Sequence, residues 1–318
     1  MVDKNSDLDN IFSVYAPAKI NLHLEILGIR SDGYHELAMV MQSIDLVDEI
    51  KFISNDDSRI KLDCDDLNLS VDKNNLIVKA AELLKKKANN FTLGADILLN
   101  KNIPIGAGLA GGSADAAATL VGLNEFWQLG FTNKQLEDFS SELGSDISFC
   151  VKGGMQICFG RGEKLEPLNF INDSMAILLV KNSNVSVSTP WAYGIYKEMK
   201  SKNYLKSEFD FEKRRNQLRR QVWVRSLSEE NPPPLQNDLQ QVVAPLTPSV
   251  QKALDILSSL PEAIAFSMSG SGPSCFALYP DISSAKSDLD LYSSVFEEAG
   301  LETWCCSLRK KGVEICYG

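Results

Sequence analysis

The strongest chemical signal in this sequence is a glycine-rich segment between Pro104 and Asp115. Glycines let backbone N–H groups converge on phosphate oxygens, and Ser113 and Asp115 suit the start of a helix behind them. A helix N-terminus behind such a loop favours anions, so the segment predicts a phosphate site. The residues expected to contact phosphate are Pro104, Ile105, Gly106, Ala107, Gly108, Leu109, Ala110, Gly111, Gly112, Ser113 and Ala114.

Two other phosphate motifs overlap with this loop. The GxGxxG spacing of residues 106–111 matches the dinucleotide fingerprint, but that fingerprint needs a strand leading directly into the loop and an acid about 20 residues later. Here residues 101–104 intervene, and Phe131 stands at the place of the acid. A Walker loop needs a lysine where this chain has Gly112. A loop that only turns the chain is the remaining alternative.

Apolar periodicity outlines the elements that must position this loop. Short, partly alternating apolar runs from Phe12 to Ile53 predict an early sheet, and helical spacing begins at Leu76. A strand over residues 95–99 leads through the loop into an alanine-rich helix over about 113–127. The other expected elements are a helix over 132–143, a hairpin over 147–159 that turns at Gly153 and Gly154, a strand over 176–181, a helix over 248–260, and strands over 263–268, 274–279 and 303–308. This mixture predicts an α+β fold.

Length favours two domains. The chain has 318 residues, and a domain usually spans about 100–200 residues. A loop-like stretch around Pro167 predicts an N-terminal domain over 1–170 and a C-terminal domain over 171–318. Charge is concentrated over 197–225 and a run of three prolines follows, so residues 205–235 are expected to be an exposed, partly mobile insertion.

Overall composition excludes several classes of function. A formal net charge of -10 and a pI near 4.9 argue against nucleic-acid binding, which requires an excess of Lys and Arg. No segment has the roughly 18 uncharged apolar residues that a membrane span requires. Two histidines exclude a histidine-rich metal site, and seven cysteines without a CxxC pair indicate reduced thiols. The N-terminus lacks signal or transit character, so the expected location is the cytoplasm, or the plastid stroma if a transit peptide has been removed.

Five other segments accompany the glycine loop. They are Ala16–Leu22, Ser31–Leu37, Gly144–Phe149, Gly153–Glu163 and Met268–Pro273. With them, the chain resembles the superfamily of galactokinase, homoserine kinase, mevalonate kinase and phosphomevalonate kinase from Tyr15 to about Leu278. The segment Ser31–Leu37 is similar to the branch of that superfamily that serves the non-mevalonate isoprenoid pathway.

This resemblance implies a two-domain small-molecule kinase fold, with an N-terminal domain like ribosomal S5 domain 2 and a ferredoxin-like C-terminal domain. It implies ATP-dependent phosphorylation of the 2-hydroxyl of a small alcohol that carries a cytidine diphosphate group, with ATP as co-substrate and Mg²⁺ bound to it. No nucleic acid or membrane is expected as a partner, and the chain is expected to be a monomer or a weak homodimer. The alternatives are a kinase of the same superfamily for another small alcohol, and a nucleotide-binding protein without catalysis.

The resemblance places the catalytic roles on Lys19 and Asp146. Phosphoryl transfer to an alcohol needs a group that orients and deprotonates the hydroxyl and a positive charge that stabilises the phosphate oxygens. Asp146 would act as the base or aim the hydroxyl, and Lys19 would polarise the attacking oxygen. Each residue alone would be an ordinary surface charge, so the prediction depends on the surrounding segments.

The resemblance also implies a substrate site. Tyr34 and Tyr193 would hold cytosine between aromatic faces, and His35 would hydrogen-bond to the base; a core aromatic is the alternative for Tyr193. Asn21 should face the same cleft as the catalytic lysine by strand alternation, and it is assigned to the substrate together with Thr189.

Three residues outside the loop are assigned to the ATP side. Asn75 resembles the adenine-side helix start of the family, although asparagine is also a common helix N-cap. Lys101, just before the loop, would lie over ATP. Ser113 is the best candidate for a protein ligand of Mg²⁺, because no acidic pair stands out in the sequence.

Overall fold

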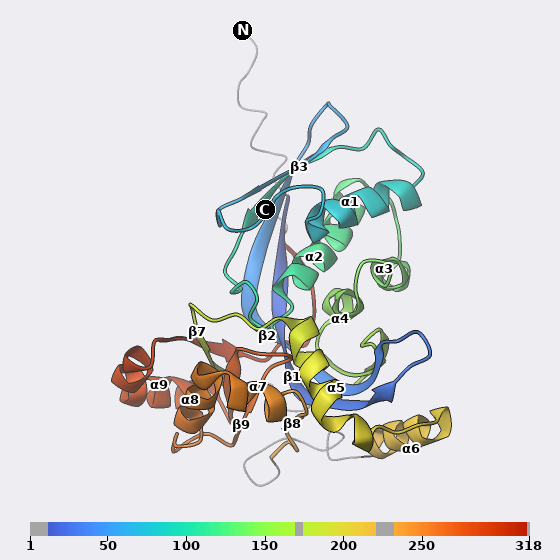
Figure 1. Cartoon of the computed structure of the whole chain (residues 1–318). Helices are drawn as coiled ribbons and strands as arrows, with labels where there is room; N and C mark the ends of the chain where they lie inside the picture. The colour runs from blue at the N-terminus through green and yellow to red at the C-terminus, as the bar shows by residue number, and fades with distance from the viewer. Residues whose placement is uncertain (1–11, 169–173, 221–231, 317–318) are drawn as a thin grey trace.

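The computed structural model describes residues 12–168, 174–220 and 232–316. These residues form two sheets, each covered by helices (Figure 1). The sheets touch where Ile44 of the first forms an isolated bridge with Leu308 next to the second. None of the helices in the described part of the chain has the length and apolar content needed to cross a membrane.

Two long antiparallel strands, β1 (Phe12–Ile29) and β2 (His35–Ile53), form the middle of the first sheet. Both faces of β1 are covered, so consecutive residues such as Ile20 and Asn21 are buried instead of alternating with exposed ones. The other strands of this sheet are β3 (Ile60–Cys64), β4 (Ala95–Asn100), β5 (Met155–Gly160), β6 (Lys164–Pro167), β8 (Gln236–Asn237) and β12 (Glu314–Cys316).

Four helices belong to this first half of the chain. They are α1 (Leu76–Lys87), α2 (Gly111–Phe126), α3 (Asn133–Ser140) and α4 (Ser145–Lys152). The small side chains of α2 let it lie close to the sheet, and a Cβ on Gly122 would come within 2.4 Å of the Phe52 ring. Helix α2 therefore sits rigidly over β1 and β2, with its N-terminus behind the glycine loop.

The second sheet is antiparallel in the order β11-β7-β10-β9. Its strands are β7 (Ala176–Asn182), β9 (Ala265–Met268), β10 (Cys275–Tyr279) and β11 (Leu301–Ser307), and its helices are α7 (Gln240–Leu246), α8 (Pro248–Leu257) and α9 (Ile282–Glu298). Numbered along the chain, this strand order is 4-1-3-2, with α8 and α9 in the two crossovers, which is the ferredoxin-like arrangement. The predicted α+β fold is confirmed.

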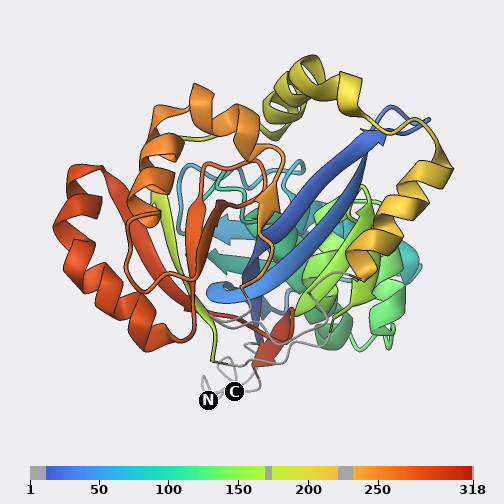
Figure 2. The ribbon, with the colours of Figure 1, turned by 90° about the horizontal axis from the view of Figure 1, so that it is seen from below.

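Between β7 and β8 the chain forms α5 (Thr189–Lys200), the short 3₁₀ helix η1 (Ser201–Asn203) and α6 (Glu208–Arg219). Seen from below in Figure 2, α6 lies beside the tips of β1 and β2. The buried Arg215 of α6 forms an ion pair with the buried Glu36 of β2. The prediction of an exposed insertion is therefore wrong for the inner face of this helix, where Phe211, Arg215 and Leu218 are buried, whereas its outer face is exposed. Residues 221–231 of that segment lie outside the described part.

One predicted element has the wrong type. The hairpin expected over 147–159 is in fact α4 followed by the single strand β5. Its apolar run is too short to distinguish a buried strand from a buried helix by period, and packing against α2 and α3 selects the helix. The predicted domain boundary at residue 170 falls outside the described residues. The division stays a prediction, since β8 and β12 return to the first sheet.

Candidate functional site

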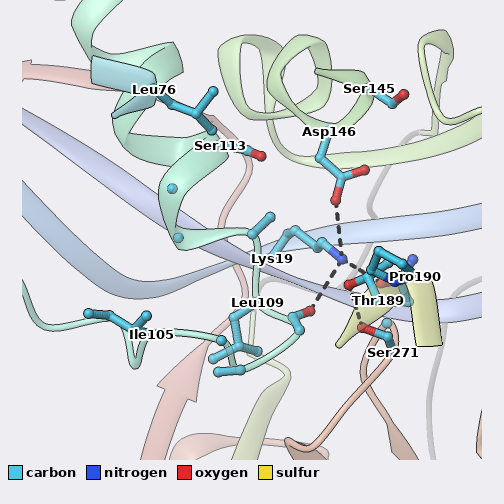
Figure 3. Close-up of a pocket in the computed structure, with 18 of the residues that line it drawn as sticks. Lys19, Leu76, Ile105, Leu109, Ser113, Ser145, Asp146, Thr189, Pro190 and Ser271 are labelled. Atoms are coloured by element: carbon cyan, nitrogen blue, oxygen red, sulfur yellow. Dashed lines mark hydrogen bonds and ion pairs between the residues drawn. The ribbon is translucent and has the colours of Figure 1, made fainter. Parts of the chain in front are cut away.

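A cavity of about 930 Å³ lies where the two halves of the chain meet. The glycine loop, the middle of β1, the first turn of α4, the start of α5 and the turn at Gly270 and Ser271 all contribute to its walls. In Figure 3, dashed lines join the Lys19 amino group to Asp146 and to a backbone carbonyl of the glycine loop, and join Thr189 to Ser271. The cavity thus collects residues from the glycine loop and from all five of the other segments singled out by the sequence.

The backbone of the glycine loop packs against the turn at residues 269–272 at a distance that only glycine permits. Gly108 has a φ of +75°, and a Cβ there would lie 2.6 Å from the Ser269 carbonyl oxygen. Ala110 adopts a left-handed conformation and starts α2 without a side-chain cap. The N-terminus of this 16-residue helix faces the cavity, which gives it N–H groups and a positive dipole end for an anion.

The predicted phosphate-contacting residues from Pro104 to Ser113 all line this cavity. Ala114 does not: it is fully buried, and its N–H donates to the Ala110 carbonyl at 2.8 Å. The structure therefore does not support a contact between Ala114 and ATP, because the N–H group of Ala114 is already used in a hydrogen bond of the helix.

A buried cluster of charges lies beneath the loop. The ammonium group of Lys101 contacts Asp48, and it donates to Asp115 Oδ2 at 2.9 Å. Asp48 also accepts from the backbone N–H groups of Asn102 and Ile103 at 2.6 and 2.8 Å. Burial disfavours charge on Lys101, but the charges of Asp115 and Asp48 outweigh this effect and raise the pKa of Lys101. Lys101 lines the cavity, and its contact with ATP stays a prediction. Its ion pairs also connect the end of β4 to β2 and α2.

The predicted catalytic residues lie next to each other in the cavity wall. Lys19 lies at an irregularity of β1 where its N–H leaves the ladder and donates to the Leu109 carbonyl at 3.1 Å. Its Nζ donates to Asn21 Oδ1 at 2.7 Å and lies 3.7 Å from Asp146 Oδ2 (Figure 3). The expectation that Asn21 shares the cleft with Lys19 is confirmed. An ammonium group and a carboxylate thus meet at one point of the cavity wall.

Asp146 is presented by the first turn of α4. The preceding Gly144 adopts extended backbone, and the helix dipole favours a carboxylate at this end. Across from it, Gly162 follows β5, and a Cβ there would lie 3.6 Å from Asp146 Oδ1. The turn after β5 therefore passes directly beside the carboxylate and limits the space around it.

Aromatic side chains gather at another part of the cavity. Tyr34 is 58% exposed, and the Arg161 guanidinium lies 5.0 Å from its ring centre. Tyr193 is half-buried, and its ring centre lies 5.1 Å from that of His35. Burial and then the charge of Lys197 lower the pKa of His35, which favours a neutral imidazole at neutral pH. Two flat faces and a polar ring thus line one region, as a planar base requires.

The remaining predicted residues have mixed roles. Thr189, at the start of α5, shares a hydrogen bond with Ser271 at 2.9 Å and so ties α5 to the turn after β9. Asn75 caps α1 by accepting from the Ile77 N–H at 2.9 Å, and it also lines the cavity. The structural role of Asn75 is thus present, and its contact with ATP stays a prediction.

Sequence reasoning missed several lining residues. Arg161, Ser145, Asp115, Met39 and Leu76 all face the cavity. The first two adjoin residues that the sequence had singled out, so position next to a motif was the available signal. Among the described residues, no cluster of three or more His, Cys, Asp or Glu side chains offers a metal site.

Two segments of the chain match models of known protein families. Residues 75–156 match the GHMP kinases N terminal domain, and residues 216–296 match the GHMP kinases C terminal domain. Curated relatives include a 4-diphosphocytidyl-2-C-methyl-D-erythritol kinase of Prochlorococcus marinus (strain MIT 9313), 57% identical over 96% of each chain. The enzyme of that name from Synechococcus sp. (strain CC9605) is 54% identical over 96% of this chain and 99% of its own.

Solved structures share the fold. A crystal structure of 4-(cytidine 5'-diphospho)-2C-methyl-D-erythritol kinase superposes with a TM-score of 0.70 and 26% identity, covering 93% of this chain and 98% of that one. Homoserine kinase from Cytophaga hutchinsonii superposes with a TM-score of 0.69 and 17% identity over 99% of both chains. The second likeness concerns the fold alone.

Proposed function

Because this chain belongs to the 4-diphosphocytidyl-2-C-methyl-D-erythritol kinase family of the GHMP kinases, we propose that it phosphorylates the 2-hydroxyl of 4-diphosphocytidyl-2-C-methyl-D-erythritol with ATP. The products are the 2-phosphate and ADP, and the reaction is a step of the non-mevalonate isoprenoid pathway. The observation that carries this proposal is the meeting of the glycine loop, the Lys19–Asp146 pair and the Tyr34–His35 turn in one cavity.

The site residues divide the reaction between them. The N–H groups of the glycine loop and the N-terminus of α2 bind the phosphates of ATP. Asp146 orients the 2-hydroxyl and accepts its proton as the oxygen bonds to the γ-phosphorus and the bond from that phosphorus to the bridging oxygen breaks. Lys19, fixed by Asn21, supplies positive charge to the oxygens of the transferred group. Catalysis thus consists of positioning and electrostatic stabilisation.

Mg²⁺ accompanies ATP in this proposal. A magnesium ion bound to ATP needs only one or two protein ligands, because phosphate oxygens and waters complete its shell. The Ser113 hydroxyl, in the first turn of α2, faces the cavity and is a hard oxygen ligand that suits this ion. Ser113 would hold the ion, which supplies charge neutralisation to the phosphates.

The substrate diphosphate needs a cation of its own. Lys19, Lys101 and Arg161 are the cations that line the cavity, and the first two have carboxylate partners. In the described part of the chain no carboxylate lies within ion-pair distance of Arg161, whose guanidinium lies over Tyr34, although its charge also acts on Asp32. Arg161 follows β5 and adjoins Gly162, which lies beside Asp146. We assign the substrate diphosphate to Arg161, since it lies between the base region and the reacting hydroxyl.

We place the reaction in the cytoplasm, and the chain is proposed to work as a monomer or a weak homodimer. All seven cysteines are free, as a reducing compartment favours. Neither proposal affects the chemistry of the cavity.

The direct test is turnover by the purified protein with ATP and Mg²⁺. ADP should form with 4-diphosphocytidyl-2-C-methyl-D-erythritol, and not with mevalonate, homoserine or galactose. Activity with one of those three instead would move the protein to another branch of the superfamily. Tight ATP binding without turnover of any of the four would indicate a nucleotide-binding protein.

A further inference from the structure

The base region of the cavity is the part lined by Tyr34, His35 and Tyr193. One residue that contacts it lies outside the two matched domains. The matches end at residue 156 and resume at residue 216, and Tyr204 lies in the interval. Its hydroxyl is 3.0 Å from His35 Nε2. The two rings meet edge to face, with centres 5.7 Å apart and planes at 84°. The Nε2 atom of His35 therefore has a hydrogen-bond partner in the Tyr204 hydroxyl.

Tyr204 itself is fixed in place. Its neighbour Leu205 donates its N–H to the Leu27 carbonyl at 2.8 Å. A Cβ on Gly28 would lie 2.6 Å from the Leu205 carbonyl oxygen, so the two backbones are in direct contact. The Tyr204 ring also stacks on Tyr196, with centres 6.2 Å apart and planes at 19°. The hydroxyl therefore has a defined position relative to the end of β1.

Helix α6 anchors the residue that follows His35. Glu36 is 1% exposed, and its Oε1 accepts from Arg215 Nε at 3.1 Å and from the Gly160 N–H at 3.1 Å. Its Oε2 accepts from Arg30 at 2.9 Å. Residues 204–215 of the chain thus contact both His35, through Tyr204, and Glu36, through Arg215. These contacts restrict the rotation of His35.

The protonation states of the pair follow from its surroundings. Burial and then Lys197 lower the pKa of His35, so the imidazole is neutral at neutral pH and carries one N–H. Burial and then the charge of Asp238 raise the pKa of Tyr204 to about 12, so the phenol keeps its hydrogen. A phenol is a stronger donor than acceptor, which favours donation from Tyr204 to Nε2 and leaves the imidazole hydrogen on Nδ1.

We propose that Tyr204 is a positioning residue that fixes His35 in the Nδ1–H tautomer and thereby selects cytosine over uracil. This role rests on the proposed function, because it takes the cytidine group as the ligand beside Tyr34 and Tyr193. Cytosine offers acceptors at N3 and O2, whereas N3 of uracil carries a hydrogen. An Nδ1–H donor therefore pairs with cytosine and opposes the N3–H donor of uracil.

The tautomer can be observed directly, without turnover. The chain has two histidines, His23 and His35, so ¹⁵N-histidine labelling gives two imidazoles, which His35→Gln assigns. The expected spectrum shows His35 with its hydrogen on Nδ1, and Tyr204→Phe, which keeps the ring but loses the hydroxyl, shifts it toward a mixture. An Nε2–H tautomer in the wild type, or a spectrum that Tyr204→Phe leaves unchanged, overturns the proposal.

The specificity can be measured with CDP and UDP as probes by calorimetry. Tyr204→Phe should reduce the preference for CDP over UDP by about fivefold to tenfold, as loss of one orienting hydrogen bond predicts, with ATP affinity and Tm unchanged. In a His35→Ala background the same substitution should add nothing. The matched control is Tyr292→Phe, which removes an exposed hydroxyl bonded to the Ser259 carbonyl.

The outcomes separate this role from the proposed function. Equal loss of CDP, UDP and ATP binding in Tyr204→Phe would make Tyr204 a structural residue and overturn the proposal. Equal binding of CDP and UDP by the wild type would also overturn it. If the wild type turns over another alcohol and binds no cytidine nucleotide, the proposed function fails, and the selection of cytosine fails with it, whatever tautomer the spectrum shows.

Discussion

Lys19 Nζ lies 3.7 Å from Asp146 Oδ2, with the lysine side chain 5% exposed and the aspartate side chain 34% exposed. The cation is therefore buried in the wall, where Asn21 also holds it, while the carboxylate reaches into the cavity. A group that enters the cavity can reach the Asp146 carboxylate, whereas the Lys19 ammonium group is fixed in the wall. This asymmetry supports the proposal that Asp146 accepts the proton and that Lys19 supplies a fixed positive charge.

Asp146→Asn should lower kcat by roughly 10²–10⁴-fold with little change in either KM, because the amide fits the same space but cannot accept the proton. Steady-state kinetics with both substrates measures this. Asp138→Asn is the matched control, because Asp138 is an exposed acid paired with Lys134 and remote from the cavity. A decrease of less than tenfold for Asp146→Asn would reduce the residue to aiming the hydroxyl.

Gly108→Ala should weaken ATP binding or destabilise the loop, since a Cβ would lie 2.6 Å from the Ser269 carbonyl and φ is +75°. Gly194→Ala is the control, because Gly194 lies outside the loop and a Cβ there would meet nothing within 4 Å. The ATP dissociation constant and the Tm of both variants decide the matter. Similar behaviour of the two variants would contradict the close-approach role of Gly108.

Tyr34→Ala should cost substrate affinity with little loss of Tm, because Tyr34 is 58% exposed. Loss of one stacking face is worth roughly 1–3 kcal/mol, which is about fivefold to over a hundredfold in KM. Tyr193→Ala should raise the same KM and also lower Tm, since its ring packs on His35 and the core. Trp191→Ala serves as the control, because Trp191 lies on α5 like Tyr193 but is exposed. A Tyr193→Ala variant that loses Tm and ATP affinity but binds substrate normally would make Tyr193 a core residue.

Arg161→Met should raise KM for the cytidine substrate by roughly tenfold or more, because the substrate diphosphate loses a charge-assisted contact. Arg161→Lys should keep part of that affinity. Binding of cytidine, CMP and CDP to the wild type and to Arg161→Met separates charge from stacking: the methionine variant should lose affinity mainly for CDP. An equal loss for all three would show that Arg161 acts only through the Tyr34 ring.

Lys101→Met should destabilise the protein by roughly 3–5 kcal/mol, because it leaves Asp48 and Asp115 buried without their cation. Adding Asp115→Asn should restore part of the stability by removing one buried charge. Lys134→Met, on an exposed ion pair, should change the free energy of unfolding by less than about 1 kcal/mol. Denaturant unfolding measures all three, and an unchanged Lys101→Met variant would contradict the role of the cluster.

Features encoded by neighbouring residues could be predicted from the sequence. The helix that begins at Leu76 is capped by Asn75, and α3 is capped by Thr132 with a reciprocal bond from Gln135, both within one turn. The glycine loop was predicted as a phosphate site because its backbone freedom and the following helix lie in one stretch of chain. In each case the interacting groups are a few residues apart, so their spacing carries the information.

Pairings between distant segments were decided by the tertiary structure. The sequence alone supplied the residue types that phosphoryl transfer requires, namely Lys19, Asp146, the glycine loop and the Tyr34–His35 turn. Only the fold placed Tyr204 behind His35 and brought Arg215 to Glu36. It also made a helix of residues 145–152, where an apolar run suited either element. The physical reason is that burial and long-range contact set these outcomes, and no local spacing specifies which distant side chain will occupy a given buried position.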